Sequence, residues 1–298
     1  MTLQDLTLSE DGSGPASVTA SFADGSTLTS HVLIGCDGSR SRTRQVLLSD
    51  ESKSSLTPTP YTILNFPYTY PADVVAELRE IHPVFKVSYH PKLNCMYMLS
   101  VLDTTRSATT GEVTFQNLLS WKGPPSASDI QADPSLALKH LRKLGAQFAP
   151  PFRTAAENVD DDAKLFADQG MQWDPRPHFT ASKAVGDRPS GRPNAAWTNR
   201  SFAGTVTLAG DAAHPMLPHR GQGLNHALED AARLVATFIA VFKEGKTDLQ
   251  DAIAAYTDEM VQRGGLEVET TAKAARAGHD WDLLMQSPIF KHGANKVR

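Results

Sequence analysis

The chain has 298 residues, of which 40% are hydrophobic and 21% charged, a composition typical of a globular protein with a sizeable core. Its formal net charge of −4 lacks the basic footprint of a nucleic-acid-binding protein. Two cysteines exclude a disulfide framework, and neither a signal peptide nor an apolar run of the ~20 residues needed to span a membrane is present, so the sequence predicts a cytoplasmic protein.

The first fifty residues predict β structure. Two β-prone runs, 18–22 and 27–34, flank Asp24-Gly25, a dipeptide that favours a hairpin turn. The second run ends in Gly35-Cys36-Asp37-Gly38, and a basic segment that includes Arg44 follows. Such a strand end can present backbone N–H groups and arginines to a phosphate. A polar loop with solvated arginines explains the same residues equally well.

The middle of the chain predicts an antiparallel sheet with helices. Apolar residues recur at helical spacing over 72–81 and 135–148. Between these segments, β-type runs cover 84–89, 95–102 and 113–119, and the first of them alternates apolar with polar residues.

A short apolar β-type run at 206–209 breaks at Gly210-Asp211, passes two prolines and reaches Gly221-Gln222-Gly223, where a long amphipathic helix begins. A strand, an irregular polar turn and a helix N-terminus can together hold a polar or anionic ligand, because free N–H groups and the positive end of the helix dipole face the turn. A tight connection rich in turn residues would explain the glycines and prolines. It explains less well why five polar side chains gather in one connection: Asp211, His214, His219, Arg220 and Asn225.

The remaining residues predict further helices. Gly245 is a plausible C-cap of the amphipathic helix, and a second helix begins at 249, where Gly264-Gly265 are expected to interrupt it.

Two stretches together resemble the class A flavoprotein monooxygenases, the group of the para-hydroxybenzoate and salicylate hydroxylases. The stretch from Gly210-Asp211-Ala212-Ala213-His214-Pro215 through Gly221-Gln222-Gly223-Leu224-Asn225 to Ala227-Leu228-Glu229-Asp230-Ala231 is similar to that family's second flavin motif, and it is closest to the fungal members. Gly35-x-Asp37-Gly38-x-x-Ser41-x-x-Arg44 is similar to the family's DG motif. Smaller similarities are Trp197-x-Asn199 and Tyr256-x-x-Glu259-Met260-x-x-Arg263-Gly264, so the resemblance covers essentially the whole chain.

The resemblance implies an FAD- and NAD(P)H-dependent monooxygenase that hydroxylates an aromatic or polyketide-like small molecule. Asp211 would bind the flavin ribityl chain, and the segment after it would lie along the isoalloxazine ring, where the helix N-terminus would stabilise negative charge. Asp37, Gly38 and Arg44 would lie near the pyrophosphate. The implied cofactor-binding residues are therefore Asp37, Gly38, Arg44, Gly210, Asp211, Pro215, Gly221, Gln222, Gly223, Leu224 and Asn225.

The family begins with a βαβ unit that carries G-x-G-x-x-G and binds the pyrophosphate. This sequence contains no such fingerprint, since Gly12-Ser13-Gly14 lacks the third glycine and precedes a strand. We therefore expect an incomplete FAD site that binds FAD weakly. The expected surfaces left by the absent unit are apolar and would need a homodimer or a partner chain to cover them. Three explanations for the missing fingerprint are open: a truncated product, one half of a split enzyme, or a repurposed protein.

A repurposed protein would be a flavin-independent cyclase, isomerase or dehydratase acting on a natural-product intermediate. His214, His219 and Arg220 are its candidate catalytic residues, with Asp211 as a further acid-base group. A hydrolytic metal site of His214, His219 and His226 is a weaker hypothesis, because their spacing matches no helix-face ligand pattern, and we predict no metal. An interaction module with a decayed pocket is a further alternative.

The sequence thus predicts a mixed α/β fold: an incomplete, Rossmann-like flavin domain, a substrate domain with an antiparallel sheet, and C-terminal helices. The expected segments are a flavin-domain remnant at 1–50, a substrate domain at 51–185, the second flavin segment at 186–245 and a helical segment at 246–298.

Overall fold

The computed structural model describes residues 2–9, 16–178, 202, 204–287 and 290–291. These residues divide into two compact units: unit 1 comprises Met1–Thr57 and Met171–Lys273, and unit 2 comprises Pro58–Gly170 and Ala274–Arg298. The predicted mixed α/β fold with antiparallel strands and C-terminal helices is confirmed. Trp197-x-Asn199 and Gly12-Ser13-Gly14 lie outside the described residues.

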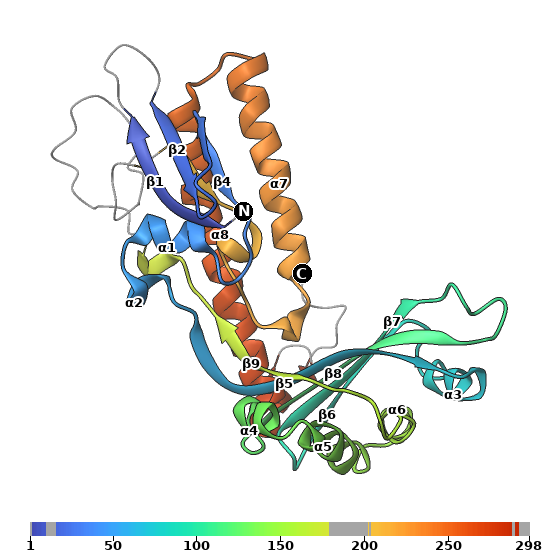
Figure 1. Ribbon diagram of the computed structural model, residues 1–298. Helices are drawn as coiled ribbons and strands as arrows, with labels where there is room; N and C mark the ends of the chain where they lie inside the picture. Colours follow the sequence, from blue (N-terminus) through green and yellow to red (C-terminus); the bar gives the residue numbers. More distant parts are fainter. Residues whose placement is uncertain (1, 10–15, 179–201, 203, 288–289, 292–298) are drawn as a thin grey trace. The chain divides into compact units, whose positions relative to one another are not determined.

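Unit 1 contains a three-stranded antiparallel sheet, a two-stranded parallel sheet and two long helices (Figure 1). The strands are β1 (Leu3–Ser9), β2 (Ser17–Phe22), β3 (Thr27–Ser30), β4 (Leu33–Gly35) and β10 (Val206–Leu208). The α-helices are α1 (Arg42–Leu48), α2 (Glu51–Ser54), α7 (Gly223–Phe238) and the part of α8 (Leu249–Gly278) that lies before residue 274. Shorter helical turns are η1 (Arg176–His178), η3 (Gly210–Ala212), η4 (Pro218–Arg220) and η5 (Ile239–Lys243).

The hairpin predicted at Asp24-Gly25 is confirmed, with Gly25 at φ +82° and β2 paired antiparallel with β3. The single strand predicted over 27–34 is wrong, because this run forms two strands of different sheets. All four residues of β3 are exposed, whereas β4 pairs in parallel with β10 and ends at the buried Gly35. The two strands differ in burial, and the alternation of residue types along the run does not reveal that difference.

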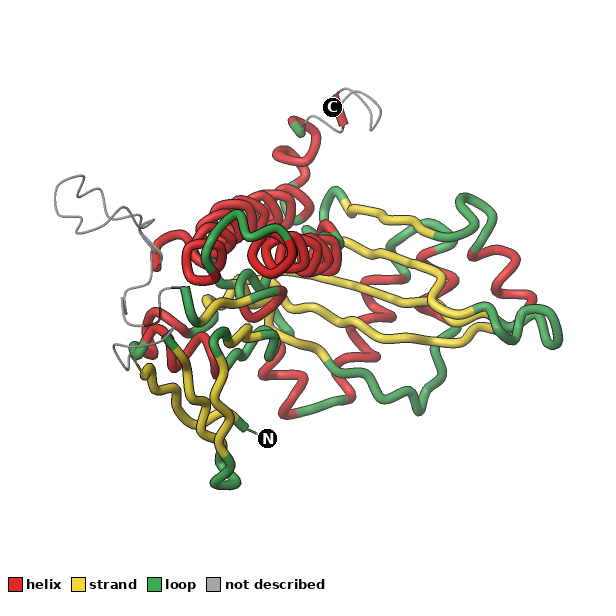
Figure 2. Tube along the Cα trace, turned by 90° about the horizontal axis from the view of Figure 1, so that it is seen from above, coloured by secondary structure: helices red, strands yellow, loops and turns green. Residues whose placement is uncertain are grey.

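The interruption predicted at Gly264-Gly265 is also wrong, since α8 is continuous over 30 residues. Helices α7 and α8 lie side by side (Figures 1 and 2). A Cβ atom on Gly264 would lie 2.6 Å from Cδ2 of His214, and one on Gly265 would lie 2.5 Å from Cγ of Arg176. The two glycines therefore allow close packing against α8, and they do not end it.

Helix α7 exposes large apolar side chains along its length, although its spacing is that of an amphipathic helix. The exposed side chains are Leu224, Leu228 and Val235 of α7 and, beyond its end, Ile239 and Phe242. Leu224 and Phe242 are 71% and 73% exposed, which is more than a helix packed on one face needs to leave in water. Helix α7 therefore presents an exposed apolar surface.

Unit 2 is a five-stranded sheet, in the order β6-β7-β8-β5-β9, with helices against one face (Figure 2). The four strands from β6 to β5 pair antiparallel. Its strands are β5 (Thr57–Tyr70), β6 (Phe85–His90), β7 (Cys95–Asp103), β8 (Val113–Lys122) and β9 (Ala167–Gln172). Its helices are α3 (Ala72–Leu78), α4 (Ala127–Ala132), α5 (Ser135–Gly145), α6 (Phe152–Glu157) and α9 (Trp281–Gln286).

The core of unit 2 lies between the sheet and α3–α6. Tyr97, Phe115 and Leu119 of the sheet are fully buried in the same apolar cluster as Leu78 and Leu141 of the helices. The three predicted β-runs and the two predicted helices are therefore confirmed, each within a few residues. Strand β5 is 14 residues long and was missed, because its three prolines are typical of a loop.

His140 of α5 is a partly buried histidine whose ring lies against that of Trp121, with centroids 4.5 Å apart. Its Nε2 atom has no hydrogen-bond partner among the described residues. Burial, assisted by the charge of Lys143, lowers the pKa of His140 from 6.5 to about 4. The folded protein therefore holds this ring neutral in a range where the unfolded chain protonates it.

Acidification from neutral pH to about pH 4.5 should destabilise the wild type more than a His140→Gln variant. Because the pKa is lower in the folded state, stability is lost as the pH falls below 6.5 and towards 4. Thermal melts of both proteins at the two pH values measure the difference. His31→Gln, at an exposed histidine, is the control and should follow the wild type. Equal falls in Tm for the His140→Gln variant and the wild type would contradict the prediction.

None of the helices in the described part of the chain combines the length and the apolar character that crossing a membrane requires.

Candidate functional site

The two motif segments of unit 1 meet at one edge of the parallel sheet. Val206 pairs with Leu33 and Leu208 pairs with Gly35, and the Ala209 N–H donates to the Gly35 carbonyl at 3.0 Å. Because parallel strands end at the same edge, Asp37-Gly38 and Gly210-Asp211 emerge together there. The structure thus brings together the two segments, some 170 residues apart in the sequence, on which the ligand-site prediction rests.

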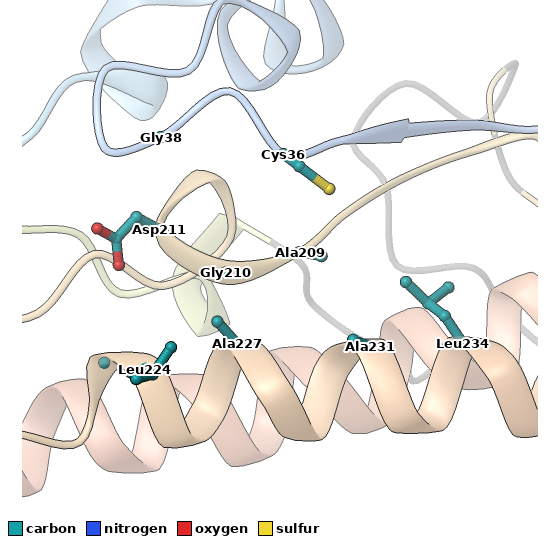
Figure 3. Close-up of a pocket in the computed structure, with 10 residues that line it drawn as sticks. Cys36, Gly38, Ala209, Gly210, Asp211, Leu224, Ala227, Ala231 and Leu234 are labelled. Atoms are coloured by element: carbon teal, nitrogen blue, oxygen red, sulfur yellow. The ribbon is translucent and has the colours of Figure 1, made fainter.

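A cavity of about 570 Å³ lies between these strand ends and helix α7 (Figure 3). Its lining is mostly apolar and consists largely of glycine, alanine and leucine. The lining residues are Cys36, Gly38, Ala209, Gly210, Asp211, Gly223, Leu224, Ala227, Ala231 and Leu234. Five predicted cofactor-binding residues are among them: Gly38, Gly210, Asp211, Gly223 and Leu224. A cavity with mostly apolar walls and few polar groups is typical of a small-molecule or cofactor site.

Asp211 is the acidic side chain among the lining residues. It is exposed, and its carboxylate has no hydrogen-bond partner among the described residues. It follows Gly210, which adopts φ +60°, a conformation that favours glycine. Asp211 therefore offers a carboxylate to a ligand without first breaking a contact within the protein.

The N-terminus of α7 lies at the same cavity. Its N-cap residue, Gln222, makes no side-chain cap hydrogen bond, and Gly221 before it adopts φ +63°. Gly223 begins the helix and lines the cavity, while the Asn225 amide donates to the Gln222 side chain at 3.0 Å. Helix N–H groups without a side-chain cap are donors for an electron-rich ligand atom, and the helix dipole adds positive potential there.

Asp37 lies beside the cavity but is engaged within the protein. It accepts hydrogen bonds from the Ser41 hydroxyl at 2.6 Å and from the Thr43 N–H at 2.9 Å. Burial alone raises the pKa of Asp37, but these hydrogen bonds outweigh it and lower the pKa below the usual value. Asp37 thus fixes the start of α1, and it stays ionised near neutral pH.

Arg44 is 1% exposed, and its guanidinium donates hydrogen bonds to backbone carbonyls. It donates to Ser54 and Ala212 at 2.9 Å and to Ser39 at 2.6 Å, and it lies 4.8 Å from the centre of the Trp173 ring. Burial lowers its pKa to about 10, and the charge of Asp37 partly offsets this effect. A direct contact between Arg44 and a phosphate would have to displace these carbonyls. Arg44 therefore stabilises the segments next to the cavity through hydrogen bonds within the protein.

His214 is fully buried and does not line the cavity. Its Nε2 lies 2.8 Å from Asp230 Oδ2, and its Nδ1 has no partner among the described residues. Pro215 after it is buried, and its carbonyl accepts from the Trp173 N–H at 3.0 Å. His219 and Arg220 lie in η4, away from the cavity lining, with Arg220 3.4 Å from Glu267. None of the three candidate catalytic residues therefore faces the cavity.

Two residues of the site carried little weight in the sequence reasoning. Asp230 of α7 is fully buried, and Arg263 of α8 forms an ion pair with it at 2.6 Å. From the sequence, both residues were identified only as parts of motifs similar to those of the flavoprotein family. The signal that could have found Asp230 is an acidic residue on the apolar face of an amphipathic helix. No group of three potential ligands that could hold a metal ion occurs in the part of the chain that the structure describes.

Comparison with known proteins agrees with this geometry. The family model described as an FAD binding domain matches residues 190–267. An FAD-dependent monooxygenase of Talaromyces islandicus is 30% identical over 276 residues, which cover 93% of this chain and 63% of that protein. Over most of its length the chain is thus similar to an FAD-dependent monooxygenase, and it contains a match to an FAD binding domain.

Solved structures share the fold of this chain. HpxO of Klebsiella pneumoniae, complexed with FAD and uric acid, has a TM-score of 0.65 at 20% identity, and the match covers 99% of this chain and 62% of HpxO. A salicylate hydroxylase substrate complex has a TM-score of 0.64 at 18% identity, covering 98% of this chain and 64% of the hydroxylase. The chain therefore spans less than two thirds of the length of each of these proteins.

Proposed function

We propose that unit 1 binds the flavin of an FAD- and NAD(P)H-dependent monooxygenase, and that unit 2 belongs to the part that holds an aromatic or polyketide-like substrate. The observation that carries the proposal is Asp211, a cavity carboxylate without a protein partner beside the uncapped N-terminus of α7. The family match and the aromatic hydroxylase among the proteins of similar fold support it.

The residues present fit a flavin. Asp211 would accept hydrogen bonds from ribityl hydroxyls, and the first N–H groups of α7 would face the electron-rich edge of the ring. Ala209, Ala227 and Ala231 have no side chain beyond Cβ, so they leave room for a planar group and form a wall that excludes water. The bound flavin would supply the reaction with NAD(P)H and oxygen, while this chain's residues bind it, orient it and stabilise its negative charge.

Asp211→Ala should weaken FAD binding about 10- to 100-fold, the usual range for a hydrogen bond to a charged group. Titration of the purified 298-residue chain with FAD, followed by flavin fluorescence, measures the dissociation constant. Glu229→Gln is the control, because Glu229 is an exposed carboxylate of α7 outside the cavity lining. Saturable binding that Asp211→Ala weakens supports the proposal. Failure of the wild type to bind at millimolar FAD would overturn it.

A flavin-independent cyclase, isomerase or dehydratase is not favoured. The named relative is a monooxygenase, and His214, the acid-base candidate nearest Asp211 in the sequence, is fully buried.

Three further expectations from the sequence stay predictions. These are the boundaries of the four segments, a homodimer or partner chain, and a cytoplasmic location. The exposed apolar side chains of α7 are the surface where we expect such a partner, and light scattering of the purified chain tests for a second copy.

A further inference from the structure

Asp230 of α7 is the one acidic side chain that is fully buried among the described residues. Its Oδ2 atom accepts from the Gly210 N–H at 2.7 Å and lies 2.8 Å from Nε2 of His214. One carboxylate oxygen thus contacts both ends of the turn from Gly210 to His214. Asp211, the cavity carboxylate, lies between those two attachment points.

The second oxygen of Asp230 is held from α8. Arg263 donates to Oδ1 at 2.6 Å, and the same guanidinium contacts Glu259 at 2.9 Å and Nδ1 of His226 at 3.1 Å. Burial on its own raises the pKa of Asp230. The hydrogen bonds from His214, Arg263 and Gly210 outweigh it and lower the pKa below the usual value, so the carboxylate is ionised near neutral pH.

We propose that the buried Asp230–Arg263 pair is the positioning element of the cavity, which holds the Gly210–His214 turn so that Asp211 is presented to the ligand. Asp230 and Arg263 are absent from the cavity lining, so they act through the turn as positioning residues. The part of this inference that concerns FAD rests on the proposed function, whereas the part that concerns the turn does not.

The chemistry of the pair predicts a specific pattern of variants. In Asp230→Asn, the amide oxygen can accept from Gly210 only if the amide NH₂ group opposes Arg263, so one set of contacts is lost in either orientation. In the double variant Asp230→Asn/Arg263→Gln, the Asn oxygen can still accept from Gly210 and its NH₂ group can donate to the Gln oxygen. A neutral pair then replaces the ion pair without a buried charge that lacks a partner.

Hydrogen exchange of the 298-residue chain, read by mass spectrometry over residues 209–214, tests the turn directly. We expect Asp230→Asn to speed exchange there about tenfold or more while the rest of α7 keeps its protection, and the double variant to recover most of it. Lys273→Gln is the matched control, because Lys273 of α8 is exposed and pairs with Glu269, which is not one of the contacts that hold Asp230 and Arg263. Unchanged exchange in Asp230→Asn, or equal loss of protection throughout α7 and α8, would overturn the inference.

FAD titration of the same variants is the second arm. Affinity should fall about tenfold in Asp230→Asn and return to within about threefold of the wild type in the double variant. A rescue by the neutral pair is not expected if Asp230 only adds general stability. Should Asp230→Asn not fold, Arg263→Lys keeps the charge and loses the forked contact, and it should give a smaller change of the same sign in both readouts. A wild type that does not bind FAD would defeat the proposed function, while the exchange arm would still decide this inference.

Discussion

Arg44→Met is expected to lower the free energy of unfolding of unit 1 by about 3–5 kcal/mol, the largest stability effect that we predict. The substitution keeps much of the aliphatic stem but removes the charge and its donors. The carbonyls of Ser39, Ser54 and Ala212, which come from three separate segments, would then lose a common partner in a buried place. Chemical denaturation of the purified chain measures the loss.

Arg42→Met is the matched control for this prediction. Arg42 lies on the same helix and also donates to two carbonyls, those of Leu3 and Gln4, but it is exposed. Because water replaces its contacts, the expected loss is under about 1 kcal/mol. Similar losses for Arg42→Met and Arg44→Met would show that the buried guanidinium adds nothing beyond an exposed one.

Gly264→Ala should destabilise unit 1 by about 2 kcal/mol, even though alanine favours a helix over glycine by about 1 kcal/mol. The new Cβ atom would lie 2.6 Å from Cδ2 and 2.9 Å from Cβ of His214. His214 cannot yield easily, because it is fully buried and Asp230 holds its ring. We therefore expect the clash to outweigh the gain in helix propensity and to disturb the Gly210–His214 turn.

The neighbouring glycine offers the control. Gly265→Ala gains the same helix propensity, and its Cβ atom would meet the side chain of Arg176. That side chain is 30% exposed, and although its guanidinium pairs with Asp174 and Glu269, it can shift towards water more easily than the fully buried His214 ring. The net loss for Gly265→Ala should therefore be smaller, below about 1 kcal/mol. Thermal melts of the two variants separate the cases. A destabilised Gly265→Ala beside an unchanged Gly264→Ala would contradict this account of the packing.

Local residue patterns predicted much of the fold. The alternating and helical spacings found the strands β6, β7 and β8 and the helices α3, α5 and α7 to within a few residues. The family resemblance joined two glycine- and aspartate-containing strand ends, and β4 and β10 do end side by side. The strands and helices depend on near neighbours in the chain, which the sequence displays directly.

Burial and long-range contacts decided the rest, because neither can be seen in a local pattern. Gly264-Gly265 have the sequence signature of a break in a helix, but in the structure they allow His214 and Arg176 to pack against an unbroken α8. The motif residues likewise divide by burial. Asp211 is exposed and can bind a ligand, while Arg44 and His214 form hydrogen bonds within the protein. Asp230, buried behind the turn, emerges as a residue of the site only when α7, α8 and the turn are seen together.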